Sequence, residues 1–336
     1  MIDVRGFIEI VRKVLATHNL GAEGEYRRWL FQNKDGTRNL GLNEYGCADA
    51  ANILYMIGEL PGDTNKRTSW INVLQAFQKQ DTGMFAEGTH DRIHTTAYCT
   101  AALDLFDVKP IYPVKELFPL KEKENLESFL EGLDWTNNPW GESLKGSGIF
   151  ASLVLSGAVT SEWQDWYFDW LWRETDPETG LLRKGCIYEN GELKGAPLFN
   201  HMAGTFHYFF NVEYARRALR YPEQMVDTCL KIFNEKLHPP VACSIGFAEA
   251  DWIYTINHSS RQCGHRVKEC QQAITSIALS LAEFLSTIDP DTHDQLNDLH
   301  RLIGTVCALA EMQAAVPGLI KTEVPLRPVL DRRPFV

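Results

Sequence analysis

Long apolar runs and several diagnostic enzyme motifs are absent from this sequence of 336 residues. No segment reaches the roughly 18 uninterrupted apolar residues that a membrane-spanning helix needs, so we expect no such helix. The Gly-x-Gly-x-x-Gly, phosphate-loop, Gly-x-Ser-x-Gly and His-Glu-x-x-His patterns do not occur. Their absence argues against nucleotide-dependent chemistry and against a serine hydrolase.

Positive charge is scarce relative to negative charge. Lys and Arg number 33 against 44 Asp and Glu, which gives a formal net charge of −11. Nucleic acids and anionic membrane surfaces both bind to clustered basic residues, so we expect neither as a partner. The first residues include Asp3, Arg5 and Glu9, where a secretory signal would be apolar. The sequence therefore predicts a soluble, cytoplasmic protein.

Paired cysteine motifs are missing as well. The eight cysteines include no Cys-x-x-Cys pair, and several, such as Cys99, stand among apolar neighbours. This pattern favours reduced, buried thiols over a disulfide framework. His90 and His94 have the i, i+4 spacing of two metal ligands on a helix, but no third ligand is evident. We therefore predict no metal site and no cofactor.

Helical periodicity is the main positive signal. Apolar residues recur at helical spacing in about a dozen segments, among them residues 2–17, 94–106 and 266–287. Alternating β-branched runs are rare, and the best hairpin candidate spans residues 181–193, with Asn190-Gly191 as its turn. An apolar content of 44% is enough to fill a large core. We predict an all-α protein with a small β-hairpin insertion.

A unit of one turn and one helix recurs along the chain. Residues 80–85 read Gln-Asp-Thr-Gly-Met-Phe and precede a helix that starts at His94. Residues 176–182 repeat the turn before a helix that starts at His201, and residues 240–250 repeat it loosely before Asp251. Pairs of helices bury both faces when they stack in a closed ring. We predict one α/α toroid of about six helical hairpins over residues 1–316, with residues 317–336, which contain four prolines, as an extended tail packed on it.

Residues 78–106 (QKQDTGMFAEGTHDRIHTTAYCTAALDLF) resemble a repeat of the prenyltransferase and terpenoid-cyclase superfamily. Repeats of that superfamily carry a Gln…Asp-x-Gly-x-Phe turn and then a helix of Thr-x-Ala-x-x-x-Leu character; residues 176–219 resemble a more divergent copy. The resemblance implies the α/α toroid shape, which six-hairpin glycosidases, sugar epimerases and several polysaccharide lyases share. The superfamily's catalytic motifs are not matched. The Asp-x-Asp-Asp proton donor and the Asp-rich Mg²⁺ motif are absent, and Asp251, Cys263 and His265 do not reproduce its zinc-ligand spacing.

Three residues at predicted inner-helix starts are the candidate catalytic groups: His94, His201 and Asp251. All inner helices of such a ring start on one side, so side chains at equivalent starts converge on one cavity. Imidazole and carboxyl groups in one concave site are typical of acid–base chemistry. For each histidine, the alternative is a structural hydrogen bond to a turn carbonyl. The predicted substrate-binding residues, the first four of them at the rim of the cavity, are Asp49, Glu87, His90, Trp140, Tyr254, His258 and Arg261.

These residue types suit a carbohydrate-active enzyme that acts on a small-molecule or oligosaccharide ligand. Hydrolysis of a glycosidic bond needs two carboxyl groups, whereas a lyase needs a base such as His or Tyr, with Arg or Asn neutralising a uronate. The spacing leaves hydrolase, lyase and epimerase open. A non-catalytic ring that binds a small ligand or a protein is the alternative, because no complete catalytic signature is present. A terpenoid- or prenyl-processing enzyme is a weaker alternative.

Overall fold

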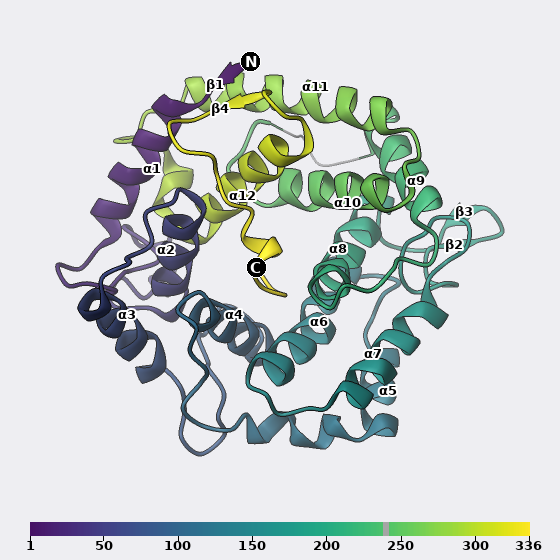
Figure 1. Cartoon of the computed structure of the whole chain (residues 1–336), viewed down its shortest axis with the longest axis horizontal. Helices are drawn as coiled ribbons and strands as arrows, with labels where there is room; N and C mark the ends of the chain where they lie inside the picture. The colour runs from purple at the N-terminus through teal and green to yellow at the C-terminus, as the bar shows by residue number, and fades with distance from the viewer. Residues whose placement is uncertain (238–241) are drawn as a thin grey trace.

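Helices make up most of the computed structural model, which describes residues 1–237 and 242–336 (Figure 1). The prediction of an all-α protein is confirmed. Six helices form an inner layer: α2 (Glu44–Met56), α4 (Arg92–Asp104), α6 (Pro139–Leu155), α8 (Leu198–Tyr214), α10 (Ala248–Cys263) and α12 (Leu299–Ala315). Six more lie outside them: α1 (Arg5–His18), α3 (Thr64–Ala76), α5 (Lys123–Glu131), α7 (Ser161–Glu174), α9 (Pro222–Asn234) and α11 (Val267–Ser286). Three 3₁₀ helices complete the helical elements: η1 (Lys115–Lys121), η2 (Asp294–Asn297) and η3 (Val329–Asp331).

The inner helices follow one another around a ring. Each packs against the next in the order α2, α4, α6, α8, α10 and α12, and α12 packs back against α2 (Figure 1). Outer helices cover the outside of this ring, with α3 against α4, α9 against α10 and α11 against α12. Small residues permit the close approach: a Cβ added to Gly204 of α8 would lie 2.8 Å from the carbonyl oxygen of Pro139 in α6. No helix within the described ranges is long and apolar enough to cross a membrane.

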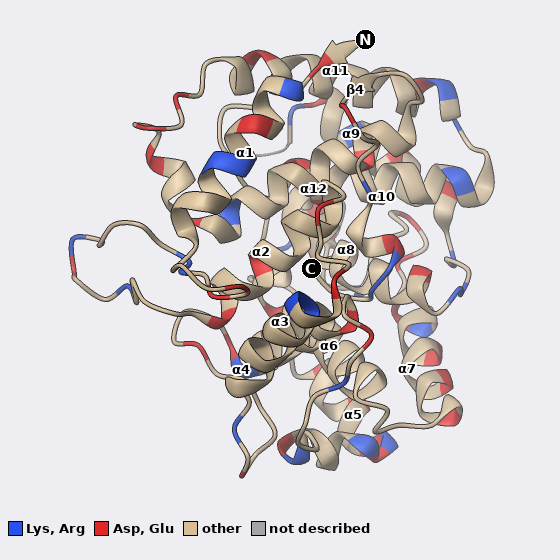
Figure 2. Ribbon diagram, turned by 60° about the vertical axis from the view of Figure 1, so that its left-hand side comes forward, with Lys and Arg blue, Asp and Glu red and all other residues tan. Residues whose placement is uncertain are grey.

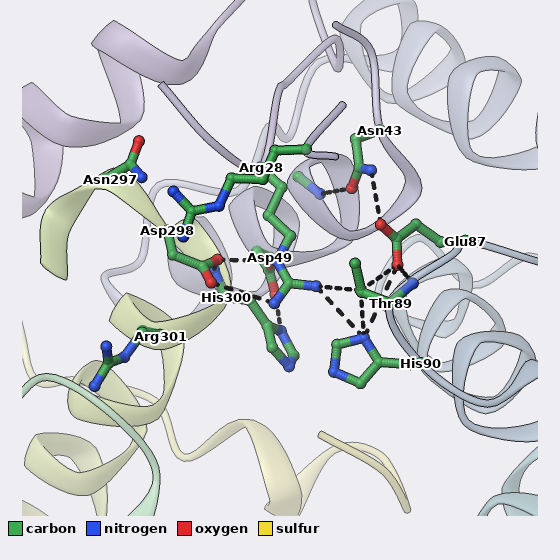
Figure 3. Close-up of polar contacts among 12 residues, drawn as sticks. Arg28, Asn43, Asp49, Glu87, Thr89, His90, Asn297, Asp298, His300 and Arg301 are labelled. Atoms are coloured by element: carbon green, nitrogen blue, oxygen red, sulfur yellow. Dashed lines mark hydrogen bonds and ion pairs between the residues drawn. The ribbon is translucent and has the colours of Figure 1, made fainter. Parts of the chain in front are cut away.

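Side-chain caps set where four of the inner helices begin, and three of these caps lie at α2, α4 and α12. Asn43, Asp91 and Asp298 accept backbone N–H hydrogen bonds of 3.1, 2.8 and 3.1 Å at the starts of α2, α4 and α12. Each cap satisfies one of the N–H groups that a helix start leaves without a partner. These three starts lie together at one end of the ring (Figure 3). This end is called the mouth below.

The two Thr-Gly turns predicted to be repeats share one structure. Gly83 and Gly180 both have positive φ angles, 77° and 71°, which glycine adopts without strain. In each turn, the backbone N–H two residues after the glycine donates to a threonine hydroxyl of the next inner helix. These threonines are Thr96 in α4, at 3.0 Å, and Thr205 in α8, at 2.9 Å. The looser third turn begins at residues 240–241, which lie outside the described residues.

The predicted β-hairpin is confirmed between α7 and α8. Strands β2 (Tyr188–Glu189) and β3 (Glu192–Leu193) pair in antiparallel fashion. Asn190 and Gly191 between them have φ angles of 55° and 84°, as a two-residue hairpin turn of the primed types requires. The hairpin projects from the outside of the ring (Figure 1).

Residues 317–336 pack on the ring and end inside it. Strand β4 (Ile320–Lys321) pairs in parallel with β1 (Ile2–Asp3), which ties the two ends of the chain together. The last residues lie at the centre of the ring (Figure 1), where Phe335 and Val336 are buried. The predicted boundary between a ring domain and a tail stays a prediction.

Candidate active site

An arginine joins three segments of the chain at the mouth of the ring (Figure 3). Arg28, from the loop before α2, donates to both carboxylate oxygens of Asp298, at 2.9 Å and 3.2 Å. Its remaining terminal nitrogen donates at 2.9 Å to the hydroxyl of Thr89, on the loop before α4. Burial opposes ionisation of Asp298, but the Arg28 charge holds its pKa below the usual value. The Arg28 side chain therefore ties the loop before α4 to the start of α12.

The loop before α4 presents an ionised carboxylate at the mouth. Glu87 Oε2 accepts a hydrogen bond from the Thr89 backbone N–H at 2.9 Å and another from the Thr89 hydroxyl. The same oxygen lies 3.9 Å from Nδ1 of His90. Burial favours the protonated form, but these contacts outweigh it and lower the pKa of Glu87 to about 2. Glu87 and His90, both predicted rim residues, are therefore neighbours at the mouth, and Glu87 is an anion at neutral pH.

Asp49, in the second turn of α2, lies below the mouth and is fully buried. Its Oδ1 accepts a hydrogen bond from the hydroxyl of Tyr98 in α4 and lies 2.9 Å from Nδ1 of His300 in α12. Its Oδ2 has no hydrogen-bond partner among the described protein groups. Burial raises the pKa of Asp49 to about 8, and the Arg28 charge and the Tyr98 hydrogen bond offset only part of this effect. Asp49 is therefore a neutral carboxylic acid at neutral pH.

Tyrosine and histidine rings stack beside Asp49. The Tyr45 ring contacts those of His90 and Tyr98, with ring centres 4.5 Å and 5.0 Å apart. The Tyr45 hydroxyl also forms a hydrogen bond with Nδ1 of His94, whose ring stacks on that of His90 at 4.8 Å. Burial, together with neighbouring positive groups, holds the pKa values of His94 and His300 well below the ordinary histidine value. Both are therefore neutral imidazoles at physiological pH.

His201, predicted to converge with His94, occupies a different register. The matching threonine hydrogen bonds equate Thr96 with Thr205, so the counterpart of His94 in α8 is Ala203. The sequence-based equivalence of His94 and His201 is therefore wrong by two residues. Residues two apart on a helix point about 200° apart, so these histidines differ in direction. His201 is fully buried, neither ring nitrogen has a described hydrogen-bond partner, and burial lowers its pKa to about 4.

Asp251 lies in the first turn of α10 and is buried. Burial and the neighbouring Glu249 charge hold its pKa well above the usual value, although the Trp140 side chain acts in the opposite direction. The Trp140 indole lies beside the carboxyl group without reaching good hydrogen-bond geometry. Within the described ranges, no hydrogen bond, ion pair or ring contact joins Asp251 to His94 or His201. Convergence of these three residues on one cavity stays a prediction.

A second buried cluster lies further along α10. The rings of Tyr254 and His258 stack with centres 3.9 Å apart. His258 Nε2 lies 3.3 Å from Oε2 of Glu311, and its Nδ1 lies 3.6 Å from Oε2 of Glu213. These carboxylates outweigh burial and raise the pKa of His258 to about 9. A helix rises 1.5 Å per residue, so His258 lies about 15 Å beyond the start of α10. His258 therefore occupies a different level of the ring from the mouth, whereas Tyr254, six residues after the start of α10, lies as deep as Tyr98 does in α4. Arg261 is exposed.

Sequence reasoning missed five residues that build the mouth: Arg28, Tyr45, Tyr98, Asp298 and His300. Arg28 lies in a loop without periodic pattern, and the two tyrosines have the spacing of ordinary core aromatics. A signal did exist for α12, because Asp298 precedes His300 at a helix start, much as Asp91 precedes His94 at the start of α4. Comparing every helix start for a cap followed by a histidine finds this pair.

Among the described residues, no group of three or more His, Cys, Asp or Glu side chains is arranged to hold a metal ion. His90 and His94, which have the spacing of two metal ligands, stack ring on ring, and Nδ1 of His94 forms a hydrogen bond with the Tyr45 hydroxyl.

The chain matches no protein-family model and no curated protein sequence.

Proposed function

We propose that this protein is a carbohydrate-active enzyme that performs acid–base chemistry at the mouth of its ring. One observation carries the proposal. Asp49 and Glu87, linked by a continuous series of hydrogen bonds (Figure 3), have pKa values shifted in opposite directions. At neutral pH, Asp49 holds its proton while Glu87 is ionised. Enzymes use such a pair to protonate a departing sugar oxygen and to stabilise the positive charge that develops on the sugar ring.

Each group has a distinct role in this proposal. Asp49 is the general acid, because Tyr98 and His300 orient its Oδ1 and leave Oδ2 without a described protein partner. Glu87 supplies the negative charge. His90, half-buried beside Glu87, contacts the substrate and accepts a proton where the reaction is an elimination or an epimerisation.

Access to Asp49 requires a movement of the chain. Glu87 and His90 are half-buried, whereas Asp49 is fully covered. The loop at residues 86–90 carries both half-buried residues and lies between solvent and the Tyr45 ring. A shift of this loop admits the substrate, and its return excludes water from the reacting atoms.

Turnover assays test the proposal. The substrate panel consists of nitrophenyl glycosides, neutral and uronate polysaccharides, and free sugars, with chromatography, absorbance of unsaturated products and NMR exchange as readouts. We expect turnover in one class and a loss of at least about 100-fold in kcat for Asp49→Asn, because a positioned general acid contributes this much. Asp227→Asn, on the outer surface beside Arg266, is the control. An Asp49→Asn variant as active as the wild type rules the proposal out.

A non-catalytic binding ring is the second candidate function. It is favoured by the complete burial of Asp49, His201 and Asp251 beneath other parts of the chain. Thermal-shift measurements on the same panel, extended to isoprenoid diphosphates, separate the candidates. Stabilisation by a sugar without any turnover supports the binding ring, whereas stabilisation by a diphosphate alone supports the weaker terpenoid alternative.

A further inference from the structure

Residues 332–336, called the tail segment here, lie inside the ring along α4. Arg332 anchors the segment, since its Nη1 donates to Oδ2 of Asp104 at 3.0 Å and its Nη2 to the Asp104 carbonyl at 2.9 Å. At the other end, the Phe335 ring centre lies 5.2 Å from that of His94. The tail segment therefore runs from the end of α4 back to the residues beneath the mouth.

Arg333 is the residue of the tail segment that lacks an explanation in terms of stability. It is fully buried, and its Cζ lies 5.7 Å from the centre of the Tyr98 ring. None of its three guanidinium nitrogens has a hydrogen-bond partner among the described protein groups. Burial lowers the pKa of Arg333 only to about 10, so it keeps its charge at neutral pH. A buried charge without a partner opposes folding, which points to a partner of another kind.

Among the described residues, no carboxylate forms a hydrogen bond with the Arg333 guanidinium. Asp49, on the far side of the Tyr98 hydroxyl, holds a proton at neutral pH. Asp104 is bound by Arg332. Near Tyr98, Asn52 Oδ1 and Asp49 Oδ2 are also buried without described partners. Unpartnered polar atoms of α2 and of the tail segment thus gather around the Tyr98 side chain, and the Arg333 guanidinium among them has no described hydrogen-bond partner.

We propose that the ring interior binds an anionic sugar, meaning a sugar that carries a carboxylate or a phosphate, and that Arg333 pairs with the acidic group. The inference rests on the proposed function and names its substrate class. A guanidinium matches a carboxylate or phosphate through two parallel N–H···O hydrogen bonds. This charge-assisted pairing is stronger where water is excluded. The pairing places the sugar beside Tyr98 and the unpartnered Oδ2 of Asp49. It also makes the tail segment part of the binding site, so the bound acid holds the segment in place.

Isothermal titration of the full chain with glucuronate, glucose 6-phosphate and glucose tests this inference. We expect at least one acid to bind, and glucose to bind at least about tenfold more weakly, because a charge-assisted pair is lost. The acid that binds more tightly identifies the natural group as carboxylate or phosphate. Equal binding of glucose and both acids, or binding of neither acid, overturns the inference.

Variants of Arg333 give a second, independent readout. Arg333→Gln removes a buried charge to which no described protein group is hydrogen-bonded, so the ligand-free variant should melt no lower than the wild type. It should also bind the acid at least about tenfold more weakly. Arg333→Lys keeps the positive charge but lacks the two parallel N–H donors of the guanidinium, so it should bind the acid with intermediate affinity. Arg266→Gln, at the outer surface, is the control. Unchanged acid binding by Arg333→Gln, or a large fall in its melting temperature without ligand, contradicts the inference.

The two proposals fail in different ways. Binding of an acid that depends on Arg333, without turnover of any sugar, leaves this inference standing and removes the proposed enzymatic function. Turnover of neutral sugars that depends on Asp49 but is unaffected by Arg333→Gln removes this inference and leaves the proposed enzymatic function standing.

Discussion

Three buried residues of the ring interior differ in protonation because they differ in partners. Asp49 contacts a hydroxyl and an imidazole, and burial therefore keeps its proton in place. His94 faces a tyrosine hydroxyl and other histidines, so burial keeps it neutral. His258 has a carboxylate on each side, and those charges overcome burial. Residue type alone does not distinguish the two histidines; the partner contributed by another helix does.

His258→Gln tests this reasoning outside the proposed site. Folding raises the pKa of His258 from the ordinary 6.5 to about 9, so the folded state binds a proton that the unfolded state releases over this range. The stabilisation is complete below the unfolded pKa and is lost as pH rises through the folded pKa. The stability advantage of wild type over His258→Gln should therefore fall by up to about 3 kcal/mol from about pH 6 to about pH 10. Urea unfolding measures it, and an advantage that is constant or grows with pH contradicts a charged His258.

At the scale of elements, sequence patterns within a few residues predicted helices, turns and a hairpin, whereas contacts between distant residues were not predicted. The helices, the Asn190-Gly191 hairpin and the two Thr-Gly turns follow from signals within a few residues, and the structure shows each of them. Glu87 and His90 were found because they stand beside such a turn.

The network around Arg28 could not be found in the same way. Its partner Asp298 is separated from it by 270 positions, and Arg28 itself lies in a loop without a periodic pattern. The register of His201 failed for a related reason. Small shifts in where a helix begins do not alter its apolar pattern visibly, but two residues turn a side chain to nearly the opposite side of the helix.

Close packing of inner helices is tested by two glycine substitutions. In Gly204→Ala, the new methyl group would lie 2.8 Å from the Pro139 carbonyl oxygen and 3.1 Å from the Trp135 ring, so α8 must shift from α6. We expect a loss of about 1–3 kcal/mol in unfolding free energy, as overpacking of a core causes. Gly6→Ala in the outer helix α1 meets no atom within 4 Å and should stabilise the protein by roughly 0.5 kcal/mol. Chemical denaturation of both variants measures the contrast, and equal effects would show that the inner helices are not tightly packed.

At the scale of the whole molecule, the ring is closed on itself and the C-terminal end of the chain lies inside it. Helix α12 packs back on α2, and β4 pairs with β1, so the first and last parts of the chain are joined. Acidic and basic residues are interspersed along the outer helices and loops (Figure 2). The tail segment lies at the centre, where its Phe335 ring contacts α4 and α8 together. A molecule built in this way should unfold as one unit, because each inner helix shares its buried face with its neighbours and with the tail segment.

Phe335→Ala tests this cooperativity. The Phe335 ring is fully buried, with its centre 5.2 Å from that of His94 in α4 and 5.6 Å from that of Phe210 in α8. Removing it leaves a cavity at the centre of the ring, and we expect a loss of about 3–5 kcal/mol in unfolding free energy. Because the ring is closed, calorimetry should still show one transition, and hydrogen exchange should rise in both α4 and α8. Phe31→Ala, at a side chain 67% exposed, should change stability by less than about 0.5 kcal/mol. Two transitions, or faster exchange confined to residues 332–336, would show instead that the tail segment is an independent plug in a ring that is stable without it.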